Sequence, residues 1–307
     1  MTKRCPACYS ENNNLFLNVI DHKKRNSFNL YECQKCGLVF LYPLPSKEKL
    51  SRYYDDDYYQ LPEKGIVGFL EENLKNAVFA KHFNRIENYV KKGTLLDVGC
   101  GNGYFLNFAK KKGWKTLGIE FSSYASKFAE RYGLKVIKKP VENVKLSKEQ
   151  FDAITFFNVL EHTSNPNNVL KKTRDWLKKK GILLIEVPDL DSLQSSVFKQ
   201  NWFHLDVPRH LLHFRRISFK RLIESNGFKI IDEYSIPFSL HEIAGWLIGL
   251  NLMLKKNKKS KKGMRRRSSR KNSLKLFTLL VFANLFRIIP NFLFFRPAIK
   301  TYILRKI

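Results

Sequence analysis

The amino-acid sequence predicts an α/β fold, a doubly wound and mostly parallel sheet covered by helices, with a small cysteine-rich module at its N-terminus. From residue 94 to residue 236, short apolar segments alternate with amphipathic segments at the spacing of β-α units. Several apolar segments, such as GILLIEVPD at 181–189, are continuous, which is typical of strands buried on both faces. Four of the five cysteines form two C-x-x-C pairs within the first 36 residues.

Composition narrows the classes of protein that this chain can belong to. The 307 residues include 56 Lys or Arg and 27 Asp or Glu, a net charge of +29, and 44% of them are hydrophobic. That apolar content excludes a disordered chain, and the charge favours contact with a polyanion or an anionic surface. Residues 240–307 carry seventeen Lys or Arg and one acid, Glu242, so much of the basic character is local.

The two cysteine pairs predict a metal site in residues 1–45. Each C-x-x-C turn presents two thiolates, and two such turns close a tetrahedral zinc site with no open position. A redox dithiol or an iron site is the alternative, and Cys100 lies far from both pairs. No apolar leader opens the chain (MTKRCPACYS), so we expect a reducing, cytoplasmic location. The expected structural zinc ligands are Cys5, Cys8, Cys33 and Cys36.

The remaining elements follow in order along the chain. Residues 46–92 are expected to form a linker and an N-terminal helical cap, in which YYDDDYY is a lid or domain contact rather than a metal site. Residues 93–236 form the main α/β domain. Its expected strands are TLLDVG, WKTLGIE, LKVIK, FDAITFFNV, GILLIEVPD and FKIIDEYSI, and its helices include YFLNFAKKKG, SSYASKFAERYG, NNVLKKTRDWLKKKG and SFKRLIESNG.

A glycine-rich turn after the first of these strands is the sharpest signal. It reads Asp97-Val98-Gly99-Cys100-Gly101-Asn102-Gly103, so the spacing is G-x-G-x-G and not the G-x-G-x-x-G of a dinucleotide site. The carboxylate of Asp97, two residues before the first glycine, would repel phosphates, but it suits a ligand that carries a sulfonium or ammonium charge. The next strand ends in Glu120, where an acid can accept hydrogen bonds from both ribose hydroxyls.

This combination resembles the class I S-adenosylmethionine-dependent methyltransferases from about residue 90 to residue 236. The resemblance implies a Rossmann-like, seven-stranded sheet and S-adenosylmethionine as the cofactor. The alternative is a tight turn in another α/β protein. Carried over by the resemblance, the cofactor-binding residues are Asp97, Gly99, Gly101, Gly103, Glu120, Val141, Glu142 and Asn158.

Two further segments resemble a bacterial-type subgroup that carries an N-terminal zinc ribbon. They are CGLVFLYPLPSKEKLSRYYDDDYY and WFHLDVPRHLLHF at 202–214. Because members often act in sugar, surface-polysaccharide or natural-product pathways, the resemblance implies a small-molecule or lipid-linked hydroxylated acceptor. An RNA-modifying or nucleic-acid-binding protein is the alternative. Methylation of an amino nitrogen typically needs [DN]-P-P-[YF] at the tip of the fourth strand, but residues 158–161 read NVLE. Methylation of pyrimidine C5 needs a nucleophilic cysteine near that tip, but Cys100, the only cysteine outside the ribbon, lies in the glycine turn. Both observations disfavour the nucleic-acid alternative.

Candidate catalytic residues follow the fourth and fifth strands. Methyl transfer is an in-line displacement, and a hydroxyl acceptor needs a base to take its proton. His162 and His210 are the expected bases, and Arg209 is expected to orient an acidic substrate group. The alternatives are that these residues only tie loops together, or that His204, Asp206, His210 and His213 bind a metal.

Residues 237–297 are expected to form a basic and apolar helical insertion. Its apolar stretches, 240–254 and 276–295, flank a run at 255–271 with eleven basic residues. The first stretch is too short to span a bilayer, the second contains Arg287 and Pro290, and two spans would break the positive-inside rule. We therefore expect a hairpin lying on an anionic membrane surface, at the inner face of the cell membrane. Packing of both helices on protein is the alternative, and residues 298–307 are expected to return as the last strand.

Overall fold

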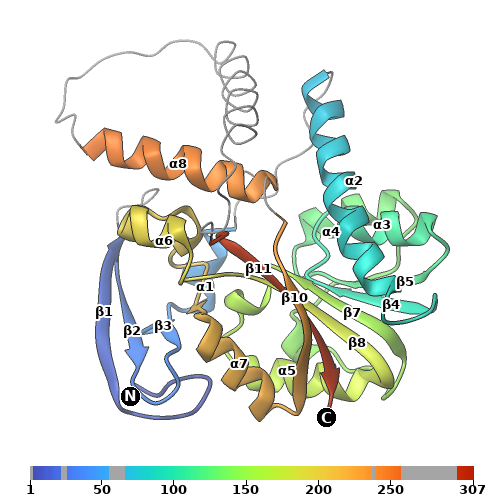
Figure 1. Cartoon of the computed structure of the whole chain (residues 1–307), viewed down its shortest axis with the longest axis horizontal. Helices are drawn as coiled ribbons and strands as arrows, with labels where there is room; N and C mark the ends of the chain where they lie inside the picture. Colours follow the sequence, from blue (N-terminus) through green and yellow to red (C-terminus); the bar gives the residue numbers. More distant parts are fainter. Residues whose placement is uncertain (1–2, 22–25, 55–65, 237–238, 257–295) are drawn as a thin grey trace.

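A computed structural model describes residues 3–21, 26–54, 66–236, 239–256 and 296–307 of the chain (Figure 1). Its main sheet has seven strands in the order β10-β11-β8-β7-β4-β5-β6. Strands β4 to β8 pair in parallel, and β11 is antiparallel to both of its neighbours. The predicted fold class, a mostly parallel and doubly wound sheet, is therefore confirmed. The strands are β4 Thr94–Val98, β5 Lys115–Ile119, β6 Val136–Ile137, β7 Phe151–Phe157, β8 Leu177–Pro188, β10 Phe228–Tyr234 and β11 Ile299–Lys306.

Helices cover both faces of this sheet because successive strand residues point to opposite sides. Leu95 packs with α2 (Ile66–Glu87) and α3 (Tyr104–Lys111), whereas Leu96 lies in a second core with α5 (Pro166–Trp176) and α7 (Arg216–Ser225). Nearly every residue along the centre of β8 is buried, as its continuous apolar sequence predicts. The other helices are α1 Lys47–Ser51, α4 Ser123–Arg131, α6 Leu193–Phe198 and α8 Leu240–Lys256, with short 3-10 turns η1 Val141–Asn143, η2 Leu160–His162, η3 Lys199–Asn201 and η4 Phe203–Leu205.

One helix ends earlier than its sequence indicates. The expected helix NNVLKKTRDWLKKKG stops at Trp176, and Leu177 already pairs with Phe151 as the first residue of β8. Lys178 then binds the Asp152 carboxylate at 2.9 Å. A Cβ at Gly181 would lie 3.0 Å from the carbonyl oxygen of Asp152, so the strands approach too closely there for a larger residue. Tertiary pairing thus overrides the helix-forming lysines.

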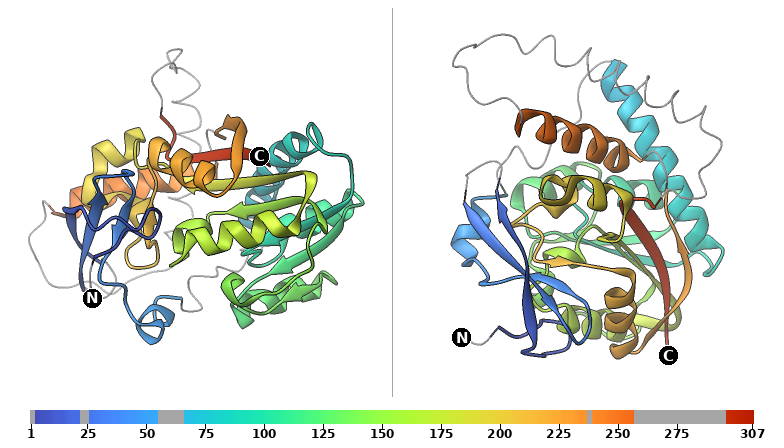
Figure 2. Two further views of the ribbon diagram at one scale, coloured as in Figure 1. Left: turned by 90° about the horizontal axis from the view of Figure 1, so that it is seen from below. Right: turned by 60° about the vertical axis from the view of Figure 1, so that its left-hand side comes forward.

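The N-terminal module forms a second, four-stranded sheet in the order β1-β2-β3-β9. Strands β1 (Asn13–Ile20), β2 (Ser27–Cys33) and β3 (Val39–Leu41) come from the module itself, but β9 (Leu212–His213) comes from the segment 202–214. A bridge between Asp189 and Phe214 joins the end of that segment to the main unit. Figure 2 shows this sheet, drawn in blue, lying against the yellow and orange segments that follow β8.

Side chains of α5 and α7 hold the two cysteine turns. The Asn167 amide donates to the carbonyl oxygens of Pro6 and Ala7 at 3.0 and 2.9 Å, and its oxygen accepts from Asn226 at 2.8 Å. Arg221 donates to the carbonyl of Lys35 at 2.8 Å. The module is therefore fixed to α5 and α7 by hydrogen bonds to its two cysteine turns.

Only part of the expected hairpin falls in the described residues. Helix α8 covers the first apolar stretch, whereas residues 257–295, with most of the basic run and all of the second stretch, lie outside the described residues. Glu242 of α8 is buried, and its carboxylate accepts from Gln194 at 2.8 Å and from the Ile299 amide of β11 at 3.0 Å. Within the described ranges, no helix has the length and apolarity that crossing a membrane requires.

The Asn167 contacts give a first prediction. Asn167→Ala should lower the free energy of unfolding by about 1 to 3 kcal/mol, because two partly buried carbonyl groups lose their donor and the Asn226 amide loses its acceptor. Denaturant titration of the zinc-loaded protein measures this change. Asn168→Ala is the matched control, since that exposed side chain lies one residue along the same helix and should change stability by less than about 0.5 kcal/mol. Equal losses in the two variants would contradict the anchoring role of Asn167.

Candidate functional site

The glycine turn lies at the carboxyl ends of β4, β5 and β7, which are adjacent in the main sheet. Gly99, Gly101 and Gly103 all have left-handed backbones, with φ of 70°, 52° and 77°. A Cβ at Gly99 would lie 2.4 Å from the Val159 side chain, and one at Gly103 would lie 2.7 Å from Ala129. A Cβ at Gly101 would meet nothing within 4 Å. Packing thus requires two of the glycines, and the third borders open space in which a ligand can approach the backbone.

Two buried acids flank this space. The Oδ1 atom of Asp97 accepts from the Thr155 hydroxyl at 2.6 Å, and Glu120 accepts from the amides of Gly101 at 2.9 Å and Ser122 at 2.8 Å. Burial raises the pKa of Asp97 to about 7 and also raises the pKa of Glu120. A cationic ligand beside Asp97 would favour its charged form. These residues therefore fit a ligand with a positive charge better than a pyrophosphate.

Asn158 stands at the tip of β7 with a left-handed backbone, φ 54°. Its amide nitrogen Nδ2 donates to Glu186 Oε1 at 2.8 Å, whereas its Oδ1 is buried with no hydrogen-bond partner among the described residues. A buried oxygen without a donor is costly, so a ligand N–H or O–H would satisfy it. Figure 1 shows β7 and β8 side by side, as their pairing requires.

Sequence reasoning missed the network behind Asn158. Glu186 Oε2 lies 3.3 Å from His82 Nε2 and accepts from the Thr301 hydroxyl at 3.1 Å, and His82 Nδ1 lies 2.9 Å from the Tyr234 hydroxyl. The one available signal was the single acid inside the apolar strand GILLIEVPD. Through these side chains the network joins α2, β8, β10 and β11 next to Asn158.

The other expected cofactor residues lie in η1, which follows β6. Val141 is buried, and Glu142 is partly exposed. The ammonium group of Lys172 on α5 donates to the backbone carbonyl of Glu142 and, at 3.1 Å, to that of Val144. Both residues thus sit at the end of the sheet that carries β5 and β6.

The segment 202–214 brings His210 and Arg209 to the turn that contains Glu161 and His162. The rings of His162 and His210 have centroids 4.6 Å apart. His162 Nδ1 lies 2.9 Å from the Arg209 carbonyl oxygen, and His210 Nδ1 lies 2.8 Å from that of His204. Burial lowers the pKa of His162 to about 4 and that of His210 well below its usual value, so both imidazoles are neutral at pH 7.

The guanidinium of Arg209 is bound within the same segment. Its Nε donates to Asp206 Oδ2 at 2.9 Å, and its Nη1 donates to the carbonyl of Tyr53 at 3.3 Å. The side chain therefore contacts both the 202–214 segment and the end of the N-terminal module. Tyr54, the next residue, places its hydroxyl 3.1 Å from His162 Nδ1.

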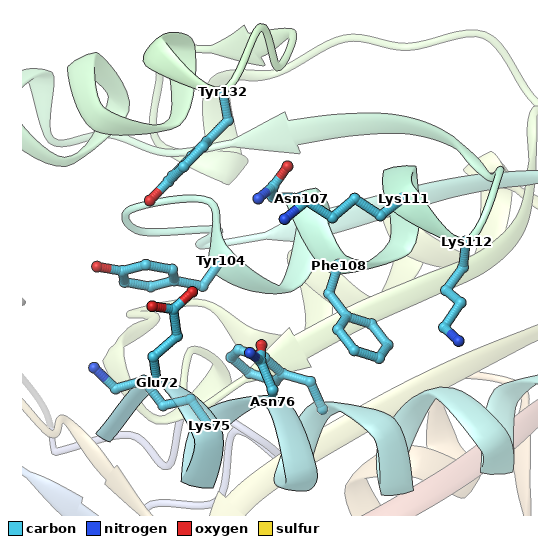
Figure 3. A pocket seen from close by; sticks show the side chains of 10 residues that line it. Glu72, Lys75, Asn76, Tyr104, Asn107, Phe108, Lys111, Lys112 and Tyr132 are labelled. Atoms are coloured by element: carbon cyan, nitrogen blue, oxygen red, sulfur yellow. The ribbon is translucent and has the colours of Figure 1, made fainter. Parts of the chain in front are cut away.

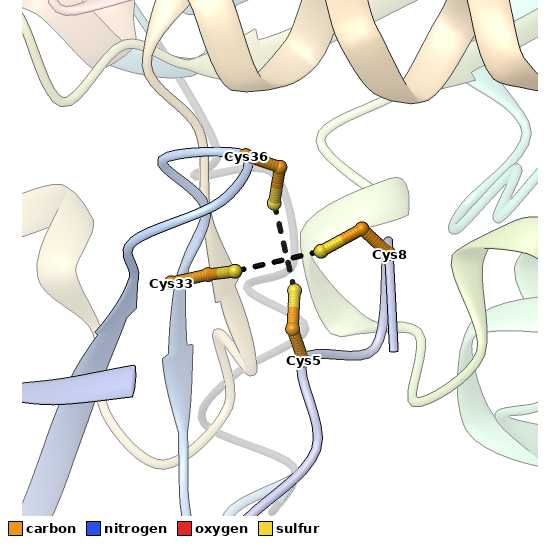
Figure 4. A group of neighbouring side chains, drawn as sticks. All are labelled: Cys5, Cys8, Cys33 and Cys36. Carbon is orange, nitrogen blue, oxygen red and sulfur yellow. Dashed lines mark hydrogen bonds between the residues drawn. The ribbon is translucent and has the colours of Figure 1, made fainter. Parts of the chain in front are cut away.

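The four ribbon cysteines converge on one point (Figure 4). The Sγ atoms of Cys5 and Cys36 are 3.6 Å apart, those of Cys8 and Cys33 are 3.5 Å apart, and all four lie within 4.8 Å of one another. Zinc–sulfur bonds of about 2.3 Å in a tetrahedron place the sulfurs roughly 3.8 Å apart. The cluster therefore fits a closed zinc site.

A separate surface cavity of about 520 Å³ lies between α2 and α3 (Figure 3). None of the residues predicted to bind cofactor, acceptor or metal lines it. The lining residues are Glu72, Lys75, Asn76, Phe79, Tyr104, Asn107, Phe108, Lys111, Lys112 and Tyr132.

Comparison with known proteins matches residues 70–233 to a family described as "Methyltransferase domain". An uncharacterized protein of Methanocaldococcus jannaschii is 28% identical over 132 residues, 43% of this chain and 62% of that protein. A ubiquinone biosynthesis O-methyltransferase of Actinobacillus pleuropneumoniae is 33% identical over 122 residues, 36% of this chain and 52% of that enzyme. The chain therefore spans less than two thirds of the length of these relatives.

Among solved structures, a similar fold occurs in a protein from Galdieria sulphuraria that is named as a candidate sarcosine dimethylglycine methyltransferase. The TM-score is 0.51, and the alignment covers 84% of this chain and 98% of that one. Because the sequences are only 14% identical, the likeness supports the fold alone.

The open space at Gly101 gives a second prediction. Gly101→Ala should weaken S-adenosylmethionine binding at least tenfold, because the added methyl group enters the ligand space. Isothermal titration calorimetry measures the affinity. Gly133→Ala is the matched control, since its φ of 63° gives a similar backbone penalty, about 1 to 2 kcal/mol, and its Cβ meets only the flexible end of Lys110. Unchanged donor affinity in Gly101→Ala would show that the ligand does not approach this turn.

Proposed function

The chain belongs to the methyltransferase domain family, and from this premise we propose that it methylates a hydroxyl group of a small-molecule or lipid-linked acceptor. The acceptor class is a sugar, a polysaccharide precursor or a similar hydroxylated metabolite. S-adenosylmethionine supplies a methyl group already activated by its sulfonium charge. The observation that carries the proposal is the pair of neutral imidazoles, His162 and His210, next to the strand tip that bears Asn158.

The cofactor is proposed to bind over the glycine turn. Asp97 is proposed to stabilise the positive charge of the cofactor. Glu120, whose carboxylate accepts hydrogen bonds from the backbone amides of Gly101 and Ser122, is proposed to bind the ribose. Asn158 Oδ1 is available to accept a hydrogen bond from the cofactor, and Val141 and Glu142 are proposed to flank the adenine. Gly99 and Gly103 shape the turn itself.

Ionisation of the acceptor hydroxyl is proposed to depend on His162 and His210. Each ring uses Nδ1 to contact a backbone carbonyl, so the proton resides on Nδ1 and the lone pair resides on Nε2. Val159, three residues before His162, lies against Gly99, which brings the imidazoles close to the cofactor turn. Arg209, paired with Asp206, is proposed to orient an acidic group of the substrate.

The relatives support a hydroxyl acceptor but include another chemistry. Several matching proteins are named as ubiquinone biosynthesis O-methyltransferases. One, from Desulfotalea psychrophila, is named as a tRNA U34 carboxymethyltransferase and is 29% identical over 125 residues. RNA modification is therefore the second candidate function, supported by that relative and by the basic run at 255–271.

We also propose that the enzyme works at the inner face of the cell membrane. One face of α8 packs on α6, where a Cβ at Gly249 would lie 2.6 Å from the Phe198 ring. Ile248, Leu250 and Met253 of the same helix are exposed, and the basic run follows directly in the sequence. Apolar side chains beside a basic segment support binding to anionic lipid.

A labelled-donor experiment tests the acceptor class. Purified protein and methyl-labelled S-adenosylmethionine are incubated with separate lipid, glycan and RNA fractions, and label is expected in the lipid-linked or glycan fraction. A methyl ether keeps its label in mild alkali, whereas a methyl ester loses it. Label in RNA alone would instead establish the second candidate function.

Variants add a second readout to that experiment. His162→Gln and His210→Gln should each lower the rate roughly 10²- to 10⁴-fold with donor affinity unchanged. His213→Gln is the control, because that ring is bound through Nε2 to the Leu205 carbonyl and should leave the rate largely intact. With the pKa of His162 at about 4, protonation of that ring should not lower the rate between pH 7 and pH 5.

Vesicle sedimentation tests the membrane proposal. The protein should bind vesicles containing phosphatidylglycerol at low salt and leave them at high salt, because screening weakens the attraction of basic residues. The double substitution Ile248→Ser and Leu250→Ser should reduce vesicle binding, because it removes apolar side chains that would contact the lipid. Equal binding to neutral vesicles, or no binding at low salt, would contradict the proposal.

A further inference from the structure

Glu161, His162 and His210 form a second cluster of metal-ligand side chains, apart from the ribbon cysteines. One ligand atom from each lies within 4.8 Å of the others. The cluster joins two segments distant in sequence, the η2 turn after β7 and the segment 202–214. We propose that these three residues bind a divalent transition-metal ion, and that this ion binds the acceptor hydroxyl.

The carboxylate of Glu161 is the first reason for this proposal. The residue is 1% exposed, and neither carboxylate oxygen has a hydrogen-bond partner among the described residues. Burial raises its pKa well above the usual value, and the negative charges of Glu186 and Asp206 raise it further. A buried carboxylate with neither donor nor counter-ion is costly, and a bound cation supplies the missing partner.

The orientation of the two imidazoles is the second reason. In both rings Nδ1 points to a backbone carbonyl oxygen, that of Arg209 for His162 and that of His204 for His210. Such a contact fixes the proton on Nδ1 and leaves the Nε2 lone pair for a ligand, as in most metal-binding histidines. His210 Nε2 is 3.8 Å from Asp206 Oδ2, beyond hydrogen-bond distance, so that carboxylate does not engage the lone pair.

The ligand set indicates which ions fit. Two imidazoles and one carboxylate, without sulfur, suit Mn²⁺, Fe²⁺ or Zn²⁺ and leave positions open for another ligand, unlike the four thiolates of the ribbon. Bonds of about 2.1 Å would draw the ligand atoms to roughly 3 to 3.5 Å from one another, a side-chain adjustment within the cluster.

The ion would ionise the acceptor, a role that rests on the proposed function. A hydroxyl bound to a divalent ion has a lowered pKa, so it releases its proton to water. The alkoxide oxygen then forms a bond to the methyl carbon as the carbon–sulfur bond breaks, and that bond's electron pair stays on the uncharged sulfur. The imidazoles thus act on the hydroxyl through the ion.

Manganese binding tests the site without any acceptor. Mn²⁺ is the probe because it disfavours thiolate ligands and leaves a zinc-loaded ribbon intact. Electron paramagnetic resonance should detect one Mn²⁺ per chain in the wild type, with the dissociation constant raised at least tenfold in Glu161→Gln and in His210→Gln. Glu120→Gln is the matched acid control and should bind Mn²⁺ as the wild type does. No Mn²⁺ binding by the wild type, or equal binding by Glu161→Gln, would overturn the proposal.

Thermal unfolding covers the case in which a variant folds poorly. Glu161→Gln removes a charge without changing the side-chain volume, so it should fold, and Mn²⁺ should raise the melting temperature of the wild type but not of this variant. If Mn²⁺ binds while no hydroxyl acceptor is methylated, the proposed function fails and the ion site stands. Full methylation of a hydroxyl acceptor by protein freed of the second ion with a chelator would overturn the role of the ion in catalysis.

Discussion

The parallel register of the main sheet is the constraint on which the site depends. Val98 pairs with Ile119 on one side and with Phe156 on the other, and Phe157 pairs with Glu186, so four strands end at one edge. That edge gathers acids out of water in a chain whose net charge is +29. The charge of the site is therefore opposite in sign to that of the whole molecule, and it favours a cationic ligand, as the acid before the glycine turn predicts. The buried acids are Asp97, Glu120 and Glu161, and Glu186, which is bound to Asn158, is partly buried.

The parts of the fold and of the site that could be predicted are those that depend on residues close together in the sequence. The strand-turn-helix around Gly99 and the acid after β5 lie in continuous sequence, so their pattern predicts the fold and the family. The cysteine spacing likewise predicted a cluster that the structure assembles. The seven-stranded sheet and the methyltransferase family are both confirmed.

The parts that sequence reasoning missed all depend on contacts between distant segments. The pairing of Glu186 with Asn158, the orphaned carboxylate of Glu161 and the addition of β9 to the ribbon sheet have no periodicity or spacing that could reveal them. The prediction that this helix continues past Trp176 through the lysines was wrong for the same reason, because pairing with Phe151 draws Leu177 into the sheet. The roles assigned to His162, His210 and Arg209 stay predictions.

The position of β11 bears on how the molecule is made. This strand lies inside the sheet, between β8 and β10, although it follows them by a long stretch of chain. During synthesis on the ribosome, residues 299–306 emerge after every other strand of this sheet, so β8 and β10 cannot reach their final arrangement until β11 has been made. Until β11 emerges, the sheet has a gap between β8 and β10 whose exposed strand edges a nascent-chain chaperone could shield.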